Sequence, residues 1–367
     1  MAMPTRREFL TGLAALLAAP PWARAAASAT GQAVQLAATW QTGDGYQLGV
    51  VTIDPAGRFD IVAALDVPTR AHGFLHEPGG KLLAVARRPG HWLLRWNRQG
   101  QALAWHWIEP RRAFAGHVLA SPDGATLYTT EMDLDSGAGL IGVRDAATLQ
   151  KRDEWPTHGI DPHQLILDKS HPGSLIVANG GVPTQPETGR LKRHLEGMDS
   201  SLVRLDAGSG ELLGQWRLDD PRLSLRHLAW GGAAGRPVLG IALQAEHDAP
   251  ADKASAPVLA LFDGDTLRAV PVPRPLAGYG GDIAALAGRF AVSCPRSQGV
   301  AVYGVDGEWK DWVPLTEAYA LAATPQQIWV GGRLQTLGLA GPATPAVGAA
   351  MPDIRLDNHW IALQWNT

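Results

Sequence analysis

The sequence predicts an all-β fold, a seven-bladed β-propeller whose ring is closed by one C-terminal strand and three N-terminal strands. Short apolar strands recur in repeats of roughly 40–50 residues, which is a period typical of propeller blades. The strands are rich in Val, Leu, Ile, Trp and Ala, and Asp-Gly, Pro-Gly and Gly-Gly turns separate them. No long helical periodicity competes with this pattern after the N-terminal segment, so the repeats favour a propeller.

The N-terminal segment predicts an export signal outside the propeller. Arg6 and Arg7 precede an apolar run over residues 10–19, and Ala23-Arg24-Ala25 has the small residues of a cleavage site. We therefore expect a twin-arginine signal peptide over 1–25, a linker over 26–33 and one propeller over 34–367. The apolar run is shorter than the ~20 residues of a spanning helix, which favours cleavage and a periplasmic protein without a membrane span over an uncleaved anchor.

Composition narrows the classes of partner. Lys and Arg occur singly or in pairs and the formal net charge is −3, so we expect no nucleic-acid partner. The single cysteine, Cys294, excludes an internal disulfide, and its place at a strand end predicts a buried structural thiol. Stability must come from the core, for which 46% hydrophobic residues and 14 tryptophans supply the apolar area.

Two blades can be assigned strand by strand. The first has expected strands over residues 72–76, 82–86, 92–96 and 102–107. The next has expected strands over residues 117–121, 126–130, 140–144 and 151–155, with Pro122-Asp123-Gly124 as the hairpin turn. Later repeats begin at His163, His227, Asp282 and near Tyr319.

The last repeat begins at His359 and has only one strand, over residues 359–365. Three unassigned strands remain near the start of the mature chain, over residues 35–40, 47–53 and 59–67. Joining these four strands completes a seventh blade and removes both open sheet edges.

The first strand of most blades opens with a polar residue, and these residues should meet at one end of the channel. They are His72, His117, His163, His227, Asp282 and His359. The start of the first strand and the end of the antiparallel second strand lie on the same face of the propeller. The residues at the second-strand ends should therefore lie on the histidine face, and they are Arg87, Glu131, Asn179, Gln244 and Cys294. The two longest insertions, residues 180–200 with Arg190 and residues 245–257, should rise over the same face. The second insertion has the composition of a flexible, solvated loop.

Five of the twelve histidines share this face, which predicts a metal site formed by His72, His117, His163, His227 and His359 with Glu131 nearby. Imidazole and carboxylate ligands suit iron, zinc or copper. A seven-fold channel is wide, so we expect two or three adjacent histidines to reach one ion. The alternative for each histidine is a structural brace, as in the Gly-His pair of WD-type propellers.

The chain also resembles a known family. The motifs are the export signal, RAHGFLHEPGGKLLAVARRPG over residues 70–90, GHVLASPDGATLYTTEMD over 116–133, GIDPHQLILD over 159–168, LIVANGG over 175–181 and the loop 186–190. Together they resemble the bacterial "domain of unknown function 1513" family, and the resemblance spans essentially the whole mature chain. It implies a Tat-exported periplasmic propeller, encoded near imelysin-like and di-haem oxidoreductase-like proteins, with periplasmic iron-uptake proteins as partners.

Three functions fit these observations. The first is a periplasmic ligand- or metal-binding accessory protein that uses Arg87, Asn179, Gln244, Asp282 and Arg190 beside the histidines. The second is a lactonase-like hydrolase or an oxidoreductase, with a histidine as base and Arg87 or Arg190 orienting a small acidic substrate. The third is a protein–protein interaction scaffold. The sequence has no Gly-x-Ser-x-Gly, His-Glu-x-x-His or Cys-x-x-Cys-His motif, but propeller enzymes assemble sites from separate blades. We favour the first function because of the ring of five histidines with Glu131 nearby.

Overall fold

The computed structural model describes residues 33–43, 45–54, 58–183, 195–233, 236–340, 345–350 and 354–363. The predicted signal peptide and linker therefore lie outside the described residues, apart from residue 33, and so does Arg190. Within the described ranges, no helix is long and apolar enough to cross a membrane.

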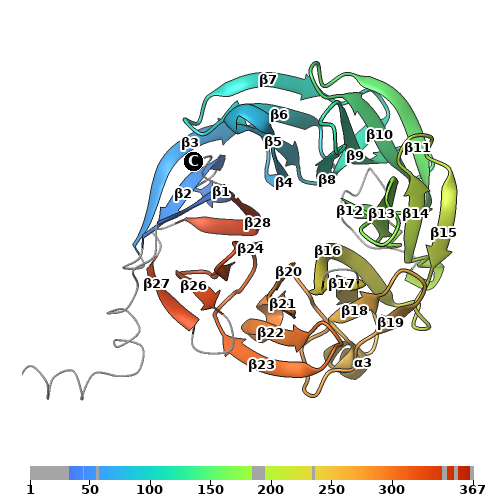
Figure 1. The fold of residues 1–367 in the computed structure, drawn as a ribbon, viewed down its shortest axis with the longest axis vertical. Helices are drawn as coiled ribbons and strands as arrows, with labels where there is room; N and C mark the ends of the chain where they lie inside the picture. Colours follow the sequence, from blue (N-terminus) through green and yellow to red (C-terminus); the bar gives the residue numbers. More distant parts are fainter. Residues whose placement is uncertain are drawn as a thin grey trace, which may run out of the picture.

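Seven four-stranded antiparallel sheets are arranged in a ring, which confirms the predicted seven-bladed propeller (Figure 1). We call the centre of the ring, between the innermost strands, the channel. The innermost strands of blades 1 to 7 are β28 (Arg355–Ala362), β4 (Ala71–His76), β8 (Arg112–Ala120), β12 (Pro162–Leu167), β16 (Leu223–Ala233), β20 (Ile283–Leu286) and β24 (Leu321–Ala323). The second strands are β1 (Val34–Thr42), β5 (Lys81–Ala86), β9 (Thr126–Asp133), β13 (Ser174–Asn179), β17 (Arg236–Ala245), β21 (Arg289–Cys294) and β25 (Gln327–Gly331).

The outer half of each blade follows the same order. The third strands are β2 (Gly45–Ile53), β6 (Trp92–Asn97), β10 (Ala138–Asp145), β14 (Ser201–Asp206), β18 (Leu259–Phe262), β22 (Gly299–Gly304) and β26 (Gln335–Ala340). The outermost strands are β3 (Phe59–Val67), β7 (Ala102–Trp107), β11 (Lys151–Ile160), β15 (Leu212–Trp216), β19 (Leu267–Ala269), β23 (Trp309–Pro314) and β27 (Pro345–Ala350).

The ring closes as predicted, by pairing of the C-terminal strand with the N-terminal ones. Strand β28 pairs antiparallel with β1, and Trp360 stands opposite Ala38. Blade 1 therefore takes one strand from the end of the chain and three from its beginning, so neither end leaves an open inner edge.

The apolar core lies between neighbouring blades and not in the channel. Leu48 and Val50 of blade 1, for example, pack in one cluster with Leu82 and Leu94 of blade 2. Similar clusters join the other neighbours, such as blades 4 and 5. Because the apolar faces are buried against each other, the channel is left to polar side chains from the innermost strands.

Three innermost strands begin earlier than predicted. Strand β8 begins at Arg112, β16 at Leu223 and β28 at Arg355, several residues before the histidine that was expected to open each strand. The residues before each histidine already pair with the second strand of the blade. A β-bulge that contains the histidine then interrupts the pairing. The histidines therefore lie within the strands and do not open them.

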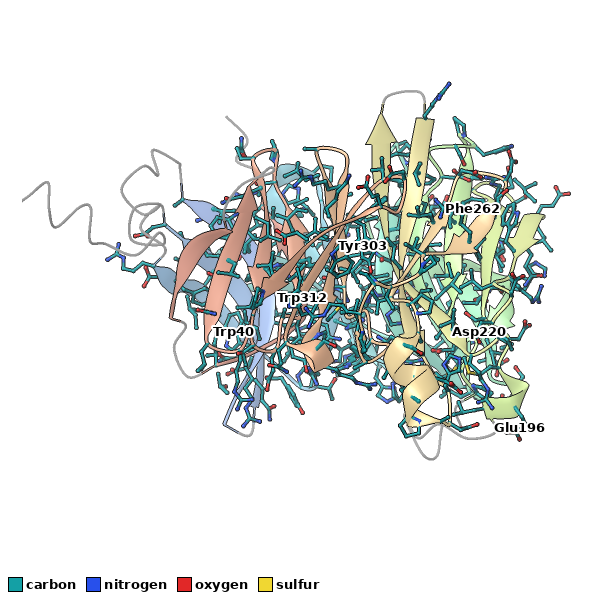
Figure 2. All side chains as sticks on the ribbon, turned by 90° about the horizontal axis from the view of Figure 1, so that it is seen from below. Trp40, Glu196, Asp220, Phe262, Tyr303 and Trp312 are labelled. Atoms are coloured by element: carbon teal, nitrogen blue, oxygen red, sulfur yellow. The ribbon has the colours of Figure 1, made fainter. Side chains whose placement is uncertain are left out.

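The described C-terminal part of the first long insertion, residues 195–200, lies at the same end of the propeller as the second insertion. Figure 2 shows the propeller from the side, with Glu196 at the same end as the short helix α3 (Pro250–Ser255). Glu196 belongs to a 3-10 helix, Leu195–Gly197, in the first insertion. The second insertion contains α3, so it has regular structure where the composition had indicated a flexible loop.

Candidate metal centre

The structure brings all five predicted histidines together at the centre of the channel; we call them the ring histidines. They are His72, His117, His163, His227 and His359. The rings of His227 and His359 lie 4.3 Å apart between centroids, and those of His72 and His227 lie 6.0 Å apart. The expectation that the channel is too wide for more than two or three to meet was wrong.

Irregular strand pairing explains why the histidines reach the centre. In each of the five innermost strands that carry a ring histidine, the pairing register shifts across that histidine. The other two innermost strands, β20 and β24, pair without a shift. Such bulges add residues to one strand and re-aim a side chain, so the five bulges direct imidazoles inward across the width of the channel.

Two glycines make room for the first pair of imidazoles. A Cβ on Gly116 would lie 2.6 Å from Cδ2 of His72, and a Cβ on Gly73 would lie 2.4 Å from the carbonyl oxygen of Gly116. Gly116 also has φ of +111°, a conformation that disfavours residues with a side chain. These positions let the His72 and His117 rings approach to 4.9 Å between centroids.

Three ring nitrogens crowd one another at the centre. Nε2 of His227 lies 2.8 Å from Nε2 of His163 and 2.8 Å from Nε2 of His359. An imidazole nitrogen carries either one proton or one lone pair in the ring plane, so it forms one good hydrogen bond. At most one of the two contacts of His227 Nε2 can therefore be a hydrogen bond. A cation bound between the nitrogens would let all of them direct lone pairs at it.

Other ring nitrogens are buried without a partner. Nδ1 of His72, Nε2 of His117 and Nδ1 of His163 have no hydrogen-bond partner in the described part of the chain. The five side chains are almost fully buried, with exposures of 1% to 8%. A buried polar atom without a partner costs roughly 1–3 kcal/mol, so three in one cluster call for a ligand. Among the described residues, no hydrogen bond joins the side chains of these three histidines to backbone, as a structural brace would require.

The cluster favours neutral imidazoles, the form that binds metals. Burial, and after it the charges of neighbouring histidines, lowers four pKa values well below the usual 6.5: those of His72, His117, His163 and His227. Arg87 lowers the pKa of His72 further, and Arg226 does the same for His163 and His227. The lone pairs are therefore available at neutral pH.

Asp282 of blade 6 orients one of the ring histidines. Its Oδ2 lies 3.2 Å from Nδ1 of His359 and accepts the backbone N–H of Leu321 at 2.9 Å, while Oδ1 accepts the N–H of Ile283 at 2.8 Å. A carboxylate that accepts the Nδ1 proton of a histidine leaves the Nε2 lone pair free for a metal, an arrangement typical of metal sites.

The geometry thus defines two overlapping sets of potential metal ligands within the described residues. In each set, one ligand atom per residue lies within 4.8 Å of one from every other member. The first set is His72, His117, His163 and His227, and the second is His227, Asp282 and His359.

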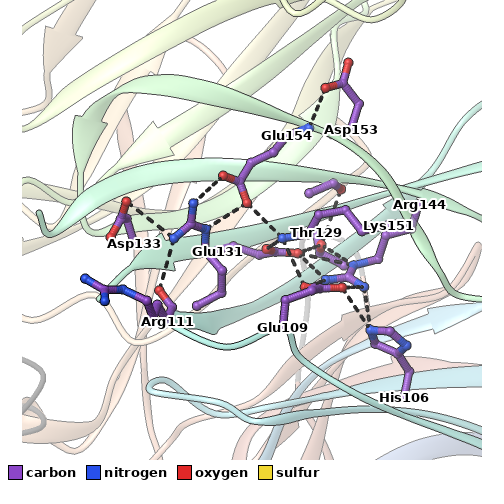
Figure 3. Close-up of polar contacts among 12 residues, drawn as sticks. His106, Glu109, Arg111, Thr129, Glu131, Asp133, Arg144, Lys151, Asp153 and Glu154 are labelled. Carbon is purple, nitrogen blue, oxygen red and sulfur yellow. Dashed lines mark hydrogen bonds and ion pairs between the residues drawn. The ribbon is translucent and has the colours of Figure 1, made fainter. Parts of the chain in front are cut away.

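Glu131 is not part of this cluster, although the sequence had indicated a metal ligand. Its fully buried carboxylate is held by Arg144 Nη2 at 2.6 Å, Lys151 Nζ at 2.6 Å and Thr129 Oγ1 at 2.6 Å (Figure 3). Glu131 stands opposite Phe114 in the register, and both its oxygens are used inside blade 3. Neither ligand set of the described residues includes it.

The remaining predicted residues lie around the cluster or in blade interiors. Asn179 is buried and donates to the carbonyl of Thr157 at 2.9 Å, and Gln244 donates to the carbonyl of Gly280 at 3.3 Å. Arg87 forms an ion pair with Asp357 at 3.7 Å. Cys294 is fully buried, as predicted, and burial raises the pKa of its thiol to about 12, so it is a poor ligand at neutral pH.

Sequence reasoning missed several charged residues next to the ring histidines. Arg226 directly precedes His227, Asp161 stands two residues before His163, and Asp357 stands two residues before His359. All three are buried. The signal that could have found them is the recurrence of a charged residue one or two positions before a ring histidine.

The fold and the cluster define a class: a seven-bladed β-propeller with a buried polyhistidine centre in its channel. The family described as "Protein of unknown function (DUF1513)" matches residues 65–363, so the chain belongs to that family. No protein among the curated sequences matches this chain.

Solved structures share the fold at low identity. A hypothetical selenium-binding protein from Sulfolobus tokodaii is 10% identical over 90% of this chain and 94% of its own, with a TM-score of 0.63. Hydrazine synthase from Kuenenia stuttgartiensis is 13% identical over 79% and 90%, with a TM-score of 0.59. A catalytically inactive virginiamycin B lyase from Staphylococcus aureus, solved with quinupristin, is 10% identical over 80% and 92%, with a TM-score of 0.55. These similarities concern the fold alone.

Proposed function

We propose that this protein binds a first-row transition-metal ion at the ring histidines and acts as a metal-binding accessory protein. The observation that carries the proposal is the convergence of five buried imidazoles from five bulged strands, four of which bring one ring nitrogen each within 4.8 Å of the others, while several ring nitrogens have no partner among the described residues. Natural proteins satisfy nearly all buried polar groups, so such a set implies a ligand with positive charge.

The spacing of the nitrogens supports a single ion with a high coordination number. For metal–nitrogen bonds of 2.0–2.1 Å, adjacent nitrogens at right angles stand about 2.9 Å apart, and those of a tetrahedral site about 3.3 Å. The Nε2 atoms of His163 and His359 each lie 2.8 Å from that of His227, close to the right-angle value. Imidazoles with an oriented carboxylate suit iron, zinc or copper, and we propose iron first because of the iron-handling setting that the family resemblance implies.

The proposed setting is the periplasm, reached by the twin-arginine route. Arg6 and Arg7 with the following apolar run support this proposal. Export of the folded protein would let the buried site form before the chain meets periplasmic metals, and periplasmic iron-uptake proteins are the proposed partners.

Metal analysis of protein purified from the periplasm tests the proposal. We expect close to one iron, zinc or copper ion per chain in the unchanged protein and a loss of that ion in His227→Ala. His91→Ala is the matched control, because His91 is an exposed histidine outside the ring. Metal-free protein with no affinity for added Fe(II), Zn(II) or Cu(II) would contradict the proposal.

A second candidate function, acid–base catalysis, is favoured by the contact between His359 and Asp282 at 3.2 Å. A histidine held by a carboxylate is the arrangement expected of a general base. Hydrolysis of small acidic lactones that is lost in both His359→Ala and Asp282→Asn, with metal content unchanged, would favour this function over metal binding.

A further inference from the structure

Four arginines and two aspartates form two groups of ion pairs beside the ring histidines; together we call them the arginine arc. Arg70 and Arg87 share the carboxylate of Asp357, and Arg88 and Arg226 share that of Asp161. Arg226 lies 2.9 Å from Asp161, and the two groups are linked through the backbone because Arg87 and Arg88 are consecutive.

The arc lies at the same end of the channel as the ring histidines. Arg70 stands two residues before His72 and Arg226 one residue before His227, and the two aspartates stand two residues before His163 and His359. Arg87 follows the second strand of blade 2, and its N–H donates to the carbonyl of Arg70 at 2.8 Å. The arc therefore connects residues of blades 1, 2, 4 and 5 around the histidine cluster.

The two ends of the arc differ in exposure. The side chains of Asp161, Asp357 and Arg226 are 1%, 2% and 1% exposed, whereas those of Arg87, Arg88 and Arg70 are 13%, 15% and 41% exposed. One end of the arc thus contacts solvent and the other is buried against the ring histidines, which provides a polar path between them.

The buried end of the arc is not saturated. Nε of Arg226 has no hydrogen-bond partner in the described part of the chain, although its Nη1 binds Asp161. Gly180 packs over this group, since a Cβ there would lie 2.6 Å from Asp161 Oδ2 and 2.9 Å from Arg226 Nη1. A buried guanidinium with an unused donor is the kind of group that binds an oxyanion.

The charges of the arc do not cancel. Four guanidinium groups face two carboxylates, so these six groups sum to a formal charge of about +2. Burial lowers the pKa of Arg226, and the nearby buried carboxylate of Glu246 raises it, so Glu246 offsets part of this charge. A divalent ion on the imidazoles would add about two more positive charges, and the carboxylate of Asp282 would remove one. Excess positive charge is costly in a buried site, so an anion from outside would stabilise a loaded centre.

We propose that the arginine arc binds a small multivalent oxyanion, a carboxylate or a phosphate, that also occupies an open coordination position of the metal ion held by the ring histidines. This proposal rests on the proposed metal-binding function. Guanidinium groups present planar pairs of donors that match the oxygens of carboxylates and phosphates. The physiological ligand of the centre is then a metal together with an anion, and the anion fixes which metal complexes the protein accepts.

The test uses the full chain loaded with Co(II), whose visible spectrum reports its coordination. Inorganic phosphate and succinate are titrated separately into cobalt-loaded and metal-free protein, by absorption and calorimetry. Arg87→Gln and Arg70→Gln are the variants, because each leaves Asp357 with one arginine. Arg152→Gln is the control, since Arg152 is exposed and pairs with Asp145 away from the arc.

We expect phosphate or succinate to change the cobalt spectrum and to bind cobalt-loaded protein at least 10-fold more tightly than metal-free protein. Both arc variants should weaken the anion at least 10-fold with cobalt content unchanged, and Arg152→Gln should match the unchanged protein. Bound cobalt that ignores both anions, or arc variants that bind them normally, would overturn the arc proposal alone. Failure of cobalt to bind would overturn the metal function as well, and the cobalt titration shows this before any anion is added.

Discussion

The ring histidines and the buried ion pairs around Glu131 are two polar clusters of one propeller, and they differ in how fully they are satisfied. Glu131 pairs with both Arg144 and Lys151, and Glu109 adds further ion pairs to both cations. Within the described part of the chain, the ring histidines instead leave some nitrogens without partners and bring others to 2.8 Å of one another. A saturated cluster needs nothing from outside and stabilises the fold, whereas an unsaturated one is suited to binding.

Removing a ring histidine is the strongest test of the difference between the two clusters. His227→Ala should weaken metal binding at least 1000-fold, because His227 belongs to both potential ligand sets. Competition with a chromophoric chelator measures the affinity, and circular dichroism confirms the fold. Equal metal affinity in His227→Ala and in the His91→Ala control would show that the ion binds elsewhere.

Disrupting the Glu131 cluster should lower stability and leave metal affinity nearly unchanged. Glu131→Gln leaves two buried cations undercompensated, so the free energy of unfolding should fall by about 3 kcal/mol. Metal affinity should stay within 3-fold of the unchanged protein. Urea denaturation and the chelator assay give both numbers, and a large loss of metal affinity without a loss of stability would return Glu131 to the metal site.

The pH dependence of stability separates the two clusters further. The folded-state pKa of four ring histidines is below 6.5, so below about pH 6.5 the unfolded chain binds more protons than the folded one. The free energy of unfolding of metal-free protein should therefore fall as pH drops from 6.5, by up to about 1.4 kcal/mol per pH unit for each such histidine.

Urea denaturation of chelator-treated protein between pH 7.5 and 5 measures this slope. His117→Gln should make it shallower, because one of the four groups is removed. Stability that stays level or rises toward pH 5 would show that these imidazoles are already protonated in the folded protein.

The smallest expected effect on metal affinity comes from replacing Gly116, which leaves space for the His72 ring. Gly116→Ala should weaken metal binding about 10-fold, because the new Cβ would lie 2.6 Å from Cδ2 of His72. Gly124→Ala is a matched control, since Gly124 also has positive φ, +71°, but has no atom within 4 Å of the added Cβ. If both variants weaken the metal equally, backbone strain explains the loss and the contact with His72 does not.

Most of the fold could be predicted because the strands that pair in a propeller blade are mostly consecutive in the sequence. Strand 102–107 has the predicted bounds, and the turn at Asp123-Gly124 forms, with the N–H of Gly124 donating to the carbonyl of Ser121 at 2.9 Å. The closure of blade 1 followed from counting strands. What failed was the start of β8, β16 and β28, because a bulge places paired residues before the histidine and the apolar pattern does not show it.

The five histidines of the candidate site could be predicted from the sequence, but how many of them meet could not. The repeat position put five histidines at one end of the channel, yet their convergence depends on bulges that only the pairing register shows. Glu131 and Asn179 were assigned to the same face because they lie near second-strand ends. Their side chains instead point into blade interiors, which a difference of one residue in register decides.

The central claim is that several ring histidines hold one metal ion. X-ray absorption spectroscopy of the metal-loaded protein tests it most directly, because imidazole rings give a distinctive outer-shell signal. The account predicts a first shell dominated by nitrogen at about 2.0–2.1 Å with at least three imidazoles. A shell dominated by oxygen, with at most one imidazole, would contradict it.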